Sequence, residues 1–413
     1  MIYLVTKNQE LFSNDLYKII SVDESLHLLS SLDKIGIDSE TNGLSAWDND
    51  LLLFQFGCKE FQVVVDCRTV DIENYKELLE SNKKFIGWNL KFDLQFLYKH
   101  NIICTNIYDG MIVEKLLFLG YPSKMHPLSL KHAGQKYLNI ELDKSVRGKI
   151  IWSKTLTDDI IIYSAEDVAH LEDICNKQIE CLKEKDLIIA AKVENAFIPS
   201  LAYTEWCGIK LDKEKWKQKM QKDKERLDNA ISTLEEWFLK NEPNSPYIEI
   251  DRQGDLFAEN PFDLTPKVTI NWNSAKQLIP IFKKYGVDVT IEDRDKGGTK
   301  DSIDVKTLKP QANKCDLILP YIEYKEAFKV VSTYGDKFLK QINPKTGRIK
   351  SKFNQLGADT SRLSSGGNDG DIEYINFQNL PADAETRSCF TCEKGNKFLS
   401  IDFCGEELTN VAI

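Results

Sequence analysis

Residues 35–44 of the chain read IGIDSETNGL, and this stretch decides how the first part of the sequence is interpreted. Apolar residues lead into Asp38 and Glu40, and the Asn42-Gly43 pair that follows is typical of a turn. Alternate residues of a β-strand lie on the same face, so these two carboxylates would point the same way, close enough to share a cation. The stretch therefore predicts a strand that ends in a pair of metal ligands.

Two later motifs add candidate site residues to this pair. The sequence IGWNLKFDLQFL places Asn89 and Asp93 one helical turn apart, directly after another apolar strand. The sequence IIYSAEDVAHLEDI places Tyr163 and Asp167 four residues apart, on the same side of a helix. Structural roles are also open to three of these residues, since Asp93 could cap a helix, Tyr163 could lie in a core and Asp167 could form an ion pair.

In order and spacing, the three motifs resemble those of the 3′→5′ exonucleases of the DEDD class, which have an RNase H-like fold. Their pattern is a strand-borne Asp-x-Glu, then Asn-x-x-x-Asp, then Tyr-x-x-x-Asp, so the tyrosine subclass is implied. The resemblance implies that Asp38, Glu40 and Asp167 bind metal, and that Asp93 helps to hold a second ion, directly or through water. It also implies that Tyr163 orients the attacking water by a hydrogen bond.

Phosphodiester hydrolysis explains why so many oxygen ligands are needed in one place. Two Mg²⁺ or Mn²⁺ ions about 3.5–4 Å apart can activate a water and neutralise charge on the attacking and leaving oxygens. By the same resemblance, Asn89 contacts the DNA strand and Leu44 packs as a wedge against the 3′-terminal base. The substrate is then expected to be a single-stranded or frayed 3′ end, because the scissile phosphate must reach a recessed site.

The organisation of the chain changes twice along its length. Residues 1–190 alternate short β-rich runs with helical patterns, one of which covers 157–184, and this predicts an α/β or α+β domain. Residues 191–345 are mostly helical in pattern, with a long helix from about Lys213 to Leu239. Residues 346–413 are typical of β structure and loops. We therefore expect a multidomain chain with boundaries near residues 190 and 345.

Beyond residue 190 the sequence resembles family A DNA polymerases of the bacterial DNA polymerase I kind. The resemblance lies in four stretches, ENAFIPSLAYTEWCGIKLD, INPKTGRIKSKFNQLGADTSRLSS, INFQNLP and SIDFCGEEL. It implies an RNase H-like exonuclease domain over 1–190, a helical thumb-like domain over 191–345 and an incomplete polymerase palm over 346–413. In that palm, Asp402 would hold the catalytic metal, and Glu407 matches the glutamate that discriminates between sugars.

The same resemblance implies DNA contacts outside the exonuclease domain. Four residues match those that touch primer–template near the primer terminus: Arg362, Asn376, Gln378 and Asn379. Five lysines of the predicted long helix are expected to face duplex phosphates and to make affinity depend on salt: Lys215, Lys217, Lys219, Lys222 and Lys224. From Lys210 to Arg226 there are eight basic against four acidic residues, which is equally compatible with a solvated helix face.

Some positions depart from the polymerase pattern. Ser361 stands where a glycine is usual, Thr409 stands where an arginine is usual, and the connection between Arg362 and Asn376 is longer than the family pattern and rich in glycine. The fingers and the second palm aspartate would follow residue 413, so this chain alone is not expected to polymerise nucleotides. We expect either a second polypeptide that completes the palm and fingers or a longer polymerase of which this is the N-terminal part. Without a 5′-nuclease domain ahead of residue 1, the whole enzyme would resemble compact, phage-type polymerases.

Composition limits the remaining classes of function. The net charge is −10, and 42% hydrophobic with 29% charged residues is ordinary for a globular protein. No uncharged apolar run is long enough for a membrane span and the N-terminus is unlike a signal peptide, so we expect a cytoplasmic protein with no membrane partner. The ten cysteines are scattered and expected to be reduced, and the lone CxxC of Cys389 and Cys392 lacks further zinc ligands at a suitable spacing.

Two other functions compete with a proofreading exonuclease that is part of a DNA polymerase. One is a stand-alone DEDD exonuclease acting on RNA or DNA, since RNA-trimming enzymes share the same residue set. The other is a non-catalytic DNA-binding or assembly subunit of a split polymerase. The polymerase-like second half argues against the first alternative, and the presence of all five site residues argues against the second.

Overall fold

The computed structural model describes most of the chain, and its contacts divide the chain into two compact units. The described residues are 1–121, 127–142, 155–250, 266–293, 297–358, 360–369 and 372–401. The first unit comprises residues 1–209 and 348–380, and the second comprises residues 210–347 and 381–413. All residues of the predicted exonuclease site belong to the first unit.

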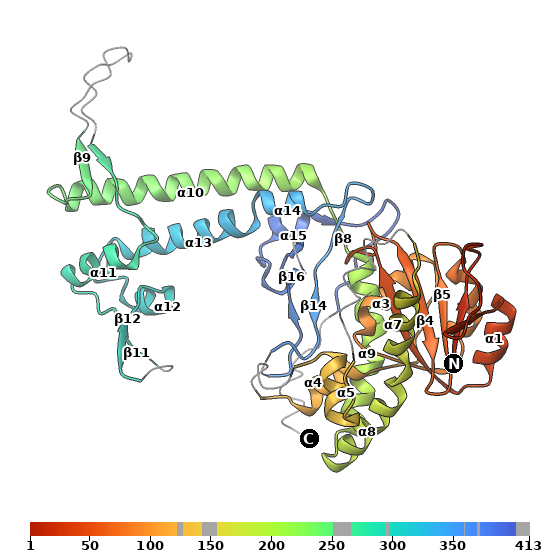
Figure 1. The fold of residues 1–413 in the computed structure, drawn as a ribbon. Helices are drawn as coiled ribbons and strands as arrows, with labels where there is room; N and C mark the ends of the chain where they lie inside the picture. Colours follow the sequence, from red (N-terminus) through yellow and green to blue (C-terminus); the bar gives the residue numbers. More distant parts are fainter. Residues whose placement is uncertain are drawn as a thin grey trace. The chain divides into compact units, whose positions relative to one another are not determined.

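A seven-stranded mixed sheet forms the centre of the first unit, with the strand order β2-β1-β5-β4-β3-β6-β7 (Figure 1). Its strands are β1 (Ile2–Val5), β2 (Tyr17–Ile19), β3 (Lys34–Thr41), β4 (Leu51–Gly57), β5 (Gln62–Asp66), β6 (Lys84–Gly87) and β7 (Ile107–Asp109). β3 is antiparallel to β4 and parallel to β6, and its residues Ile35 and Ile37 are fully buried. The predicted early strands and the α/β class are therefore confirmed.

Helices pack against this sheet and carry two of the three predicted motifs. They are α1 (Val22–Ser30), η1 (Ile72–Tyr75), α2 (Lys76–Leu79), α3 (Leu90–Lys99), α4 (Gly110–Leu117), α5 (Leu130–Leu138), α7 (Asp158–Ala169), α8 (Leu171–Glu184) and α9 (Ile188–Cys207). A Cβ atom on Gly36 of β3 would lie 2.8 Å from the carbonyl oxygen of Val168, so glycine permits the close approach of α7. The helical pattern predicted over 157–184 is interrupted at His170, whose φ is −112° and ψ is 0°.

α9 and residues 348–380 also belong to the first unit, so the two units do not coincide with the three predicted domains. Ile198 and Ala202 of α9 lie in the same hydrophobic core as the sheet, and the hydroxyl of Tyr98 donates to the carbonyl oxygen of Pro199 at 2.9 Å. Residues 348–380 form short elements: β13 (Arg348–Ile349), β14 (Phe353–Asn354), β15 (Ser364–Ser365), β16 (Gly367–Asp369), β17 (Ile372–Tyr374) and η4 (Phe377–Asn379). Packing on the nuclease core, which no local pattern indicates, explains the difference.

The second unit is mainly helical, as its sequence pattern predicts. Its elements are α10 (Lys213–Asn241), β9 (Ile248–Ile250), β10 (Pro266–Val268), α11 (Ala275–Lys284), β11 (Thr290–Glu292), β12 (Thr299–Asp301), α12 (Val305–Leu308), η3 (Lys309–Gln311), α13 (Ile318–Tyr334), α14 (Asp336–Lys340), α15 (Ala384–Ser388) and β18 (Phe390–Thr391). α10 and α13 lie side by side (Figure 1), and Arg226 contacts Glu323 between them at 2.5 and 2.9 Å. In the part of the chain that the structure describes, no helix is long and apolar enough to cross a membrane.

Candidate active site

Three carboxylates from two elements meet beside β3. β3 carries Asp38 and Glu40, and α7 carries Asp167. Each of these side chains offers a carboxylate oxygen, and the three oxygens lie within 4.8 Å of one another. Glu40 and Asp167 are only 8% and 6% exposed, so their charges are largely removed from water. The convergence that the sequence motifs predict is present for these three residues.

The three carboxylates line a cavity of about 450 Å³, here called the carboxylate pocket, which has the size of a small-molecule site. All seven residues predicted for the exonuclease site line it: Asp38, Glu40, Leu44, Asn89, Asp93, Tyr163 and Asp167. Tyr163 is 4% exposed and lies one helical turn before Asp167 on α7. Leu44 follows β3 and is 46% exposed, so it offers apolar surface to a ligand.

Asp93 lines the carboxylate pocket but is not among the three carboxylates that lie mutually close. It lies in the first turn of α3, and its carboxylate accepts a hydrogen bond from the hydroxyl of Ser39. Because Ser39 lies between Asp38 and Glu40 on β3, its side chain points to the opposite face of the sheet. Burial raises the pKa of Asp93 to about 7, and the Ser39 hydrogen bond opposes this rise. Asp93 therefore lies in the same pocket, held by Ser39 and near the charge of Glu40, but outside the close trio of carboxylates.

A second buried carboxylate, that of Asp109, fixes the start of α3. Asn89 precedes α3 with a φ of 67°, and the backbone N–H groups of Asn89 and Leu90 donate to Asp109 at 3.1 and 2.8 Å. Asp109 is fully buried and also caps α4 by accepting from the N–H of Met111 at 2.9 Å. Burial raises the pKa of Asp109, and these backbone donors lower it. The position of Asn89 in the pocket is thus held by its backbone, which leaves the side-chain amide available.

Sequence analysis missed four residues that build this site: Ser39, Phe92, Asp109 and Lys352. Ser39 and Phe92 lie inside the recognised motifs, but their own residue types carry no metal chemistry. Asp109 directly precedes α4, which is the position of a helix cap, yet nothing local indicates that it also binds the start of α3. Lys352 lines the carboxylate pocket from the segment 348–380, and no signal in the sequence could have placed it there.

The lysines of α10 are placed less uniformly than predicted. By the helical period they divide between two sides of α10: Lys215, Lys219 and Lys222 on one, and Lys217 and Lys224 on the other. Lys219 is 6% exposed and forms an ion pair with Asp223, so it is withdrawn from solvent in this structure. Lys217 and Lys222 pair with Glu214 and Glu385 at 2.9 and 2.7 Å. The prediction of a phosphate contact therefore does not hold for the Lys219 side chain as the structure places it.

The residues predicted for the polymerase part lie in the short elements of the first unit or outside the described residues. Arg362 is exposed. The side-chain oxygen of Asn376 caps η4 by accepting from the N–H groups of Gln378 and Asn379 at 3.0 and 3.2 Å. Two further residues lie outside the described part of the chain: Asp402 and Glu407. The DNA contacts of this group stay predictions.

The donor set of the carboxylate pocket fits a hard divalent cation. Mg²⁺ and Mn²⁺ prefer oxygen ligands, and three carboxylate oxygens lie close enough together to share an ion. Without a compensating cation, carboxylates gathered in a buried pocket repel one another and are disfavoured in their charged form. Such a pocket is therefore suited to hold positive charge and, through it, a phosphodiester.

The mixed sheet and the carboxylate pocket of the first unit agree with the RNase H-like fold that the sequence resemblance implies. Two family models match the chain, that of a 3′-5′ exonuclease over residues 17–180 and that of DNA polymerase family A over residues 249–413. Residues 249–413 are thus similar to DNA polymerase family A, and residues 17–180 are similar to a 3′-5′ exonuclease domain.

Known proteins match the chain over most of its length. The DNA polymerase I of Borreliella burgdorferi is 27% identical over 413 residues, which cover 95% of this chain and 40% of that protein. The DNA polymerase I of Aquifex aeolicus is 27% identical over 393 residues, which cover 90% of this chain and 58% of that protein. The POL domain of Pol1 from M. smegmatis, solved with DNA primer-template and dNTP, has the same fold at a TM-score of 0.65 and 18% identity, over 91% of this chain and 58% of that one. The chain thus spans 40% and 58% of the length of these two relatives.

Proposed function

We propose that the first unit is a metal-dependent 3′→5′ exonuclease that removes nucleotides from single-stranded 3′ ends of DNA. The observation that carries the proposal is the convergence of the carboxylates of Asp38, Glu40 and Asp167 within 4.8 Å. Tyr163 and Asp93 line the same pocket, so all five residues of the exonuclease pattern can act on one bound phosphodiester. The match of residues 17–180 to a 3′-5′ exonuclease model supports this proposal.

The proposal includes two Mg²⁺ or Mn²⁺ ions, for which Asp38, Glu40 and Asp167 are the ligands and Asp93 contributes to the second ion. When bound, such a pair of ions neutralises charge on the attacking and leaving oxygens of the phosphodiester. Asp93 is held by Ser39 and stands outside the close trio of carboxylates. This supports an arrangement in which the trio binds the first ion and Asp93 contributes to the second.

The other residues of the pocket act on the water and on the strand. The phenol of Tyr163 donates a hydrogen bond to the attacking water and holds it in line with the leaving oxygen. Leu44 packs against the terminal base, and the side-chain amide of Asn89 contacts the strand next to it. Because the reacting groups are buried, the 3′ end must separate from a duplex before it reaches them.

The similarity of residues 249–413 to DNA polymerase family A supports a wider role for the whole protein. We propose that the exonuclease removes misincorporated nucleotides during DNA replication, on a primer–template held by the polymerase part. The exposed lysines of α10, together with Arg362 and residues 376–379, are proposed to contact that duplex. Asp402 is proposed as a metal ligand of the polymerase site, and Glu407 as the residue that discriminates between sugars. The comparisons give no support for a second polypeptide, which stays a prediction, as does the cytoplasmic location.

One assay tests the nuclease assignment. A 3′-labelled mismatched primer–template is incubated with Mg²⁺ or Mn²⁺, and wild type is compared with Asp38→Ala. We expect wild type to release mononucleotides and Asp38→Ala to lose this activity, since one of the three close carboxylates is removed. Asp33→Ala is the matched control, because Asp33 is an exposed aspartate just before β3 and should retain full activity.

The same assay separates the alternatives. An RNA of equal sequence that is shortened faster than the DNA would favour a stand-alone exonuclease that trims RNA. Absence of product from wild type in both metals, with retained binding of the primer–template, would instead favour a non-catalytic DNA-binding subunit.

A further inference from the structure

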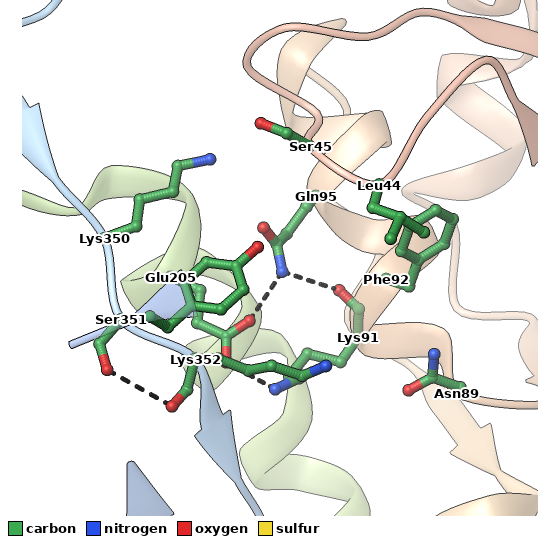
Figure 2. Close-up of a pocket in the computed structure, with 11 residues that line it drawn as sticks. Leu44, Ser45, Asn89, Lys91, Phe92, Gln95, Glu205, Lys350, Ser351 and Lys352 are labelled. Atoms are coloured by element: carbon green, nitrogen blue, oxygen red, sulfur yellow. Dashed lines mark hydrogen bonds and ion pairs between the residues drawn. The ribbon is translucent and has the colours of Figure 1, made fainter. Parts of the chain in front are cut away.

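A second cavity adjoins the carboxylate pocket within the first unit. It has a volume of about 70 Å³ and is here called the lysine pocket, after Lys91, Lys350 and Lys352 in its lining (Figure 2). The two cavities share four lining residues: Leu44, Asn89, Phe92 and Lys352. One water takes about 30 Å³ in the liquid, so the smaller cavity has room for a compact group and not for a nucleoside.

The lining of this cavity is cationic, although the chain carries a net charge of −10. Three lysines face a single carboxylate, that of Glu205, which pairs with Lys91 at 2.5 Å. Among the described residues, Lys350 makes no ion pair with a carboxylate. Its ammonium lies 3.6 Å from the ring centre of Trp47 and 5.3 Å from that of Trp206. The ammonium of Lys350 is therefore not paired by direct contact with any carboxylate of the described chain.

The aromatic surroundings of Lys350 are held in place by a hydrogen bond, and its ammonium is partly removed from water. The indole N–H of Trp47 donates to the carbonyl oxygen of Trp206 at 2.8 Å, which holds the ring beneath the ammonium. Burial lowers the pKa of Lys350 to about 7, and the charges of Asp48 and Glu205 oppose this change. An anion bound beside the ammonium would compensate for the lost hydration.

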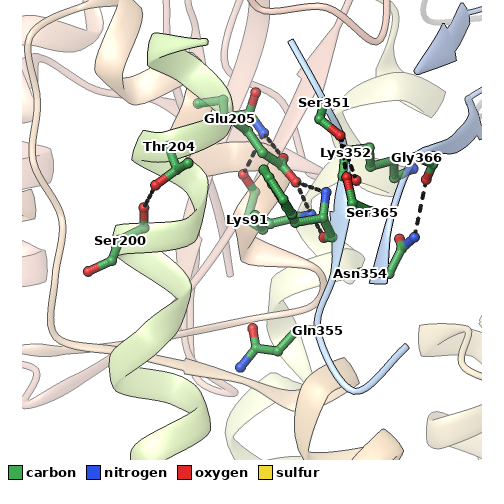
Figure 3. Close-up of polar contacts among 12 residues, drawn as sticks. Lys91, Ser200, Thr204, Glu205, Ser351, Lys352, Asn354, Gln355, Ser365 and Gly366 are labelled. Atoms are coloured by element: carbon green, nitrogen blue, oxygen red, sulfur yellow. Dashed lines mark hydrogen bonds and ion pairs between the residues drawn. The ribbon is translucent and has the colours of Figure 1, made fainter. Parts of the chain in front are cut away.

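Glu205 holds the strand segment that presents these lysines. Its carboxylate accepts from the backbone N–H of Phe353 at 2.6 Å and from the side-chain amide of Gln95 at 2.8 Å (Figure 3). The ammonium of Lys91 donates to Glu205 and also to the carbonyl oxygen of Phe353. Glu205 is 5% exposed, so this junction between α3, α9 and β14 is buried.

Ser351, which lies between the two lysines, is also held by hydrogen bonds. The hydroxyl of Ser351 shares a hydrogen bond of 2.6 Å with that of Ser365 (Figure 3), and it contacts the carbonyl oxygen of Ile375 at 2.6 Å. Lys350 and Lys352 flank Ser351, and in Figure 2 the Lys352 side chain extends toward Asn89 while that of Lys350 rises toward the side of the pocket that carries Ser45. The two lysines are thus held on a short segment between β13 and β14 whose backbone and Ser351 side chain are fixed by hydrogen bonds.

The geometry points to the lysine pocket as a phosphate subsite, in which Lys350 and Lys352 bind the phosphodiester that precedes the one cleaved in the carboxylate pocket, with Glu205 as the positioning residue. This inference rests on the proposed exonuclease function. The shared wall of Leu44, Phe92 and Asn89 separates the two subsites, so one strand can pass from the cationic cavity to the acidic one. The arrangement favours one strand polarity, with the 3′ end at the carboxylates.

Residues outside the matched exonuclease region supply this subsite. Lys350 and Lys352 lie in the part matched by the polymerase family model, residues 249–413, and Glu205 lies in neither matched region. The carboxylate and lysine pockets are therefore lined in part by residues that lie beyond the matched exonuclease region in the sequence.

Binding of short oligonucleotides tests the inference independently of hydrolysis. Fluorescent DNA pentanucleotide and dinucleotide, both with a 5′-linked dye and no terminal phosphate, are titrated in EDTA against the full chain, with anisotropy as the readout. For Lys350→Met we expect the Kd of the pentanucleotide to rise about tenfold, and its dependence on log salt to fall by about 0.7, the value of one phosphate contact on a single strand. The Kd of the dinucleotide, which has no preceding phosphate, should rise several times less.

Two further variants test whether the effect on binding is specific to the lysine pocket. Lys7→Met removes an exposed lysine after β1 and should leave both Kd values unchanged. Glu205→Gln keeps the shape of the side chain but removes the charge that holds Lys91, so it should also raise the Kd of the pentanucleotide selectively. A merely structural Glu205 would lower the melting temperature without this dependence on length.

The outcomes separate the inference from the proposed function. Equal effects of Lys350→Met on both oligonucleotides, or no effect on either, would overturn the phosphate subsite. A selective loss of pentanucleotide binding in a chain that cleaves no DNA with Mg²⁺ or Mn²⁺ would support the subsite and reject the exonuclease.

Discussion

The carboxylate pocket and the lysine pocket are neighbours with opposite charge and very different origins in the sequence. The first takes its carboxylates from three local motifs on β3, α3 and α7. The second is assembled from α3, α9 and the strand segment around Lys350, which are far apart in the chain. The residues proposed for phosphodiester chemistry can therefore be predicted from sequence motifs. The residues proposed to hold the DNA strand are brought together only by tertiary packing.

The largest effect is expected from removing a charge from the carboxylate pocket. Asp167→Asn keeps the shape of the side chain but deletes one of three close carboxylates, so Mn²⁺ affinity should fall at least about 100-fold. Asp93→Asn should weaken Mn²⁺ about tenfold, because Asp93 stands apart from the other three. Titration with Mn²⁺, followed by the paramagnetic resonance of the free ion, measures both. Equal losses would contradict the distinction between Asp93 and the close trio.

An intermediate effect is expected from pH acting on the lysine pocket. Burial lowers the pKa of Lys350 to about 7, whereas bound phosphate favours its charged form, so strand binding takes up a proton above that pH. Between pH 6.5 and 8.5 the Kd of the pentanucleotide should rise by as much as about tenfold per pH unit. Lys350→Arg, which stays charged, should flatten this profile. The other charged groups of the environment are Lys91, Lys352, Glu205 and Asp48.

The lowered pKa of Lys350 also makes the free energy of unfolding depend on pH. The folded state holds a neutral Lys350 above pH 7, while in the unfolded chain this lysine stays protonated up to its ordinary pKa of 10.5. The unfolded state therefore binds more protons in this window, so the contribution of Lys350 to the free energy of unfolding rises with pH. Urea unfolding at pH 7 and pH 9 should show a rise in wild type that is smaller in Lys350→Met.

The smallest effect is expected at the support of Asp93. Ser39→Ala removes the hydroxyl that donates to Asp93 and leaves a buried carboxylate without this partner, which costs about 1–3 kcal/mol of unfolding free energy. Ser39→Thr keeps a hydroxyl and should restore most of the loss. Urea denaturation measures both variants. If Ser39→Ala is as stable as wild type, the hydrogen bond does not position Asp93.

The sequence was sufficient for the central strands and for the carboxylates and Tyr163 of the carboxylate pocket. Apolar runs that end in Asp38 and Glu40, and the four-residue spacing of Tyr163 and Asp167, reflect backbone geometry that holds in any fold. These motifs are read locally, so their secondary structure could be predicted from the chain alone. The roles assigned to them in catalysis stay proposals.

The lining of the lysine pocket, the burial of Lys219 and the domain boundaries could not be predicted, because they depend on tertiary contacts. The carboxylate of Glu205 accepts hydrogen bonds from Phe353 and Gln95, and nothing in the sequence around Glu205 indicates these partners. The basic stretch of α10 predicted a positively charged helix, yet the pairing of Lys219 with Asp223 buries one of its lysines. Domain boundaries placed by composition likewise could not anticipate that residues 348–380 pack on the nuclease core.

Crystals of the protein soaked in Mn²⁺ would test the central claim most directly, through the anomalous scattering of the ion. The account predicts an anomalous peak coordinated by carboxylate oxygens of Asp38, Glu40 and Asp167, and its loss in Asp38→Ala crystals. Fully loaded crystals that carry Mn²⁺ elsewhere, with those three side chains unliganded, would contradict it.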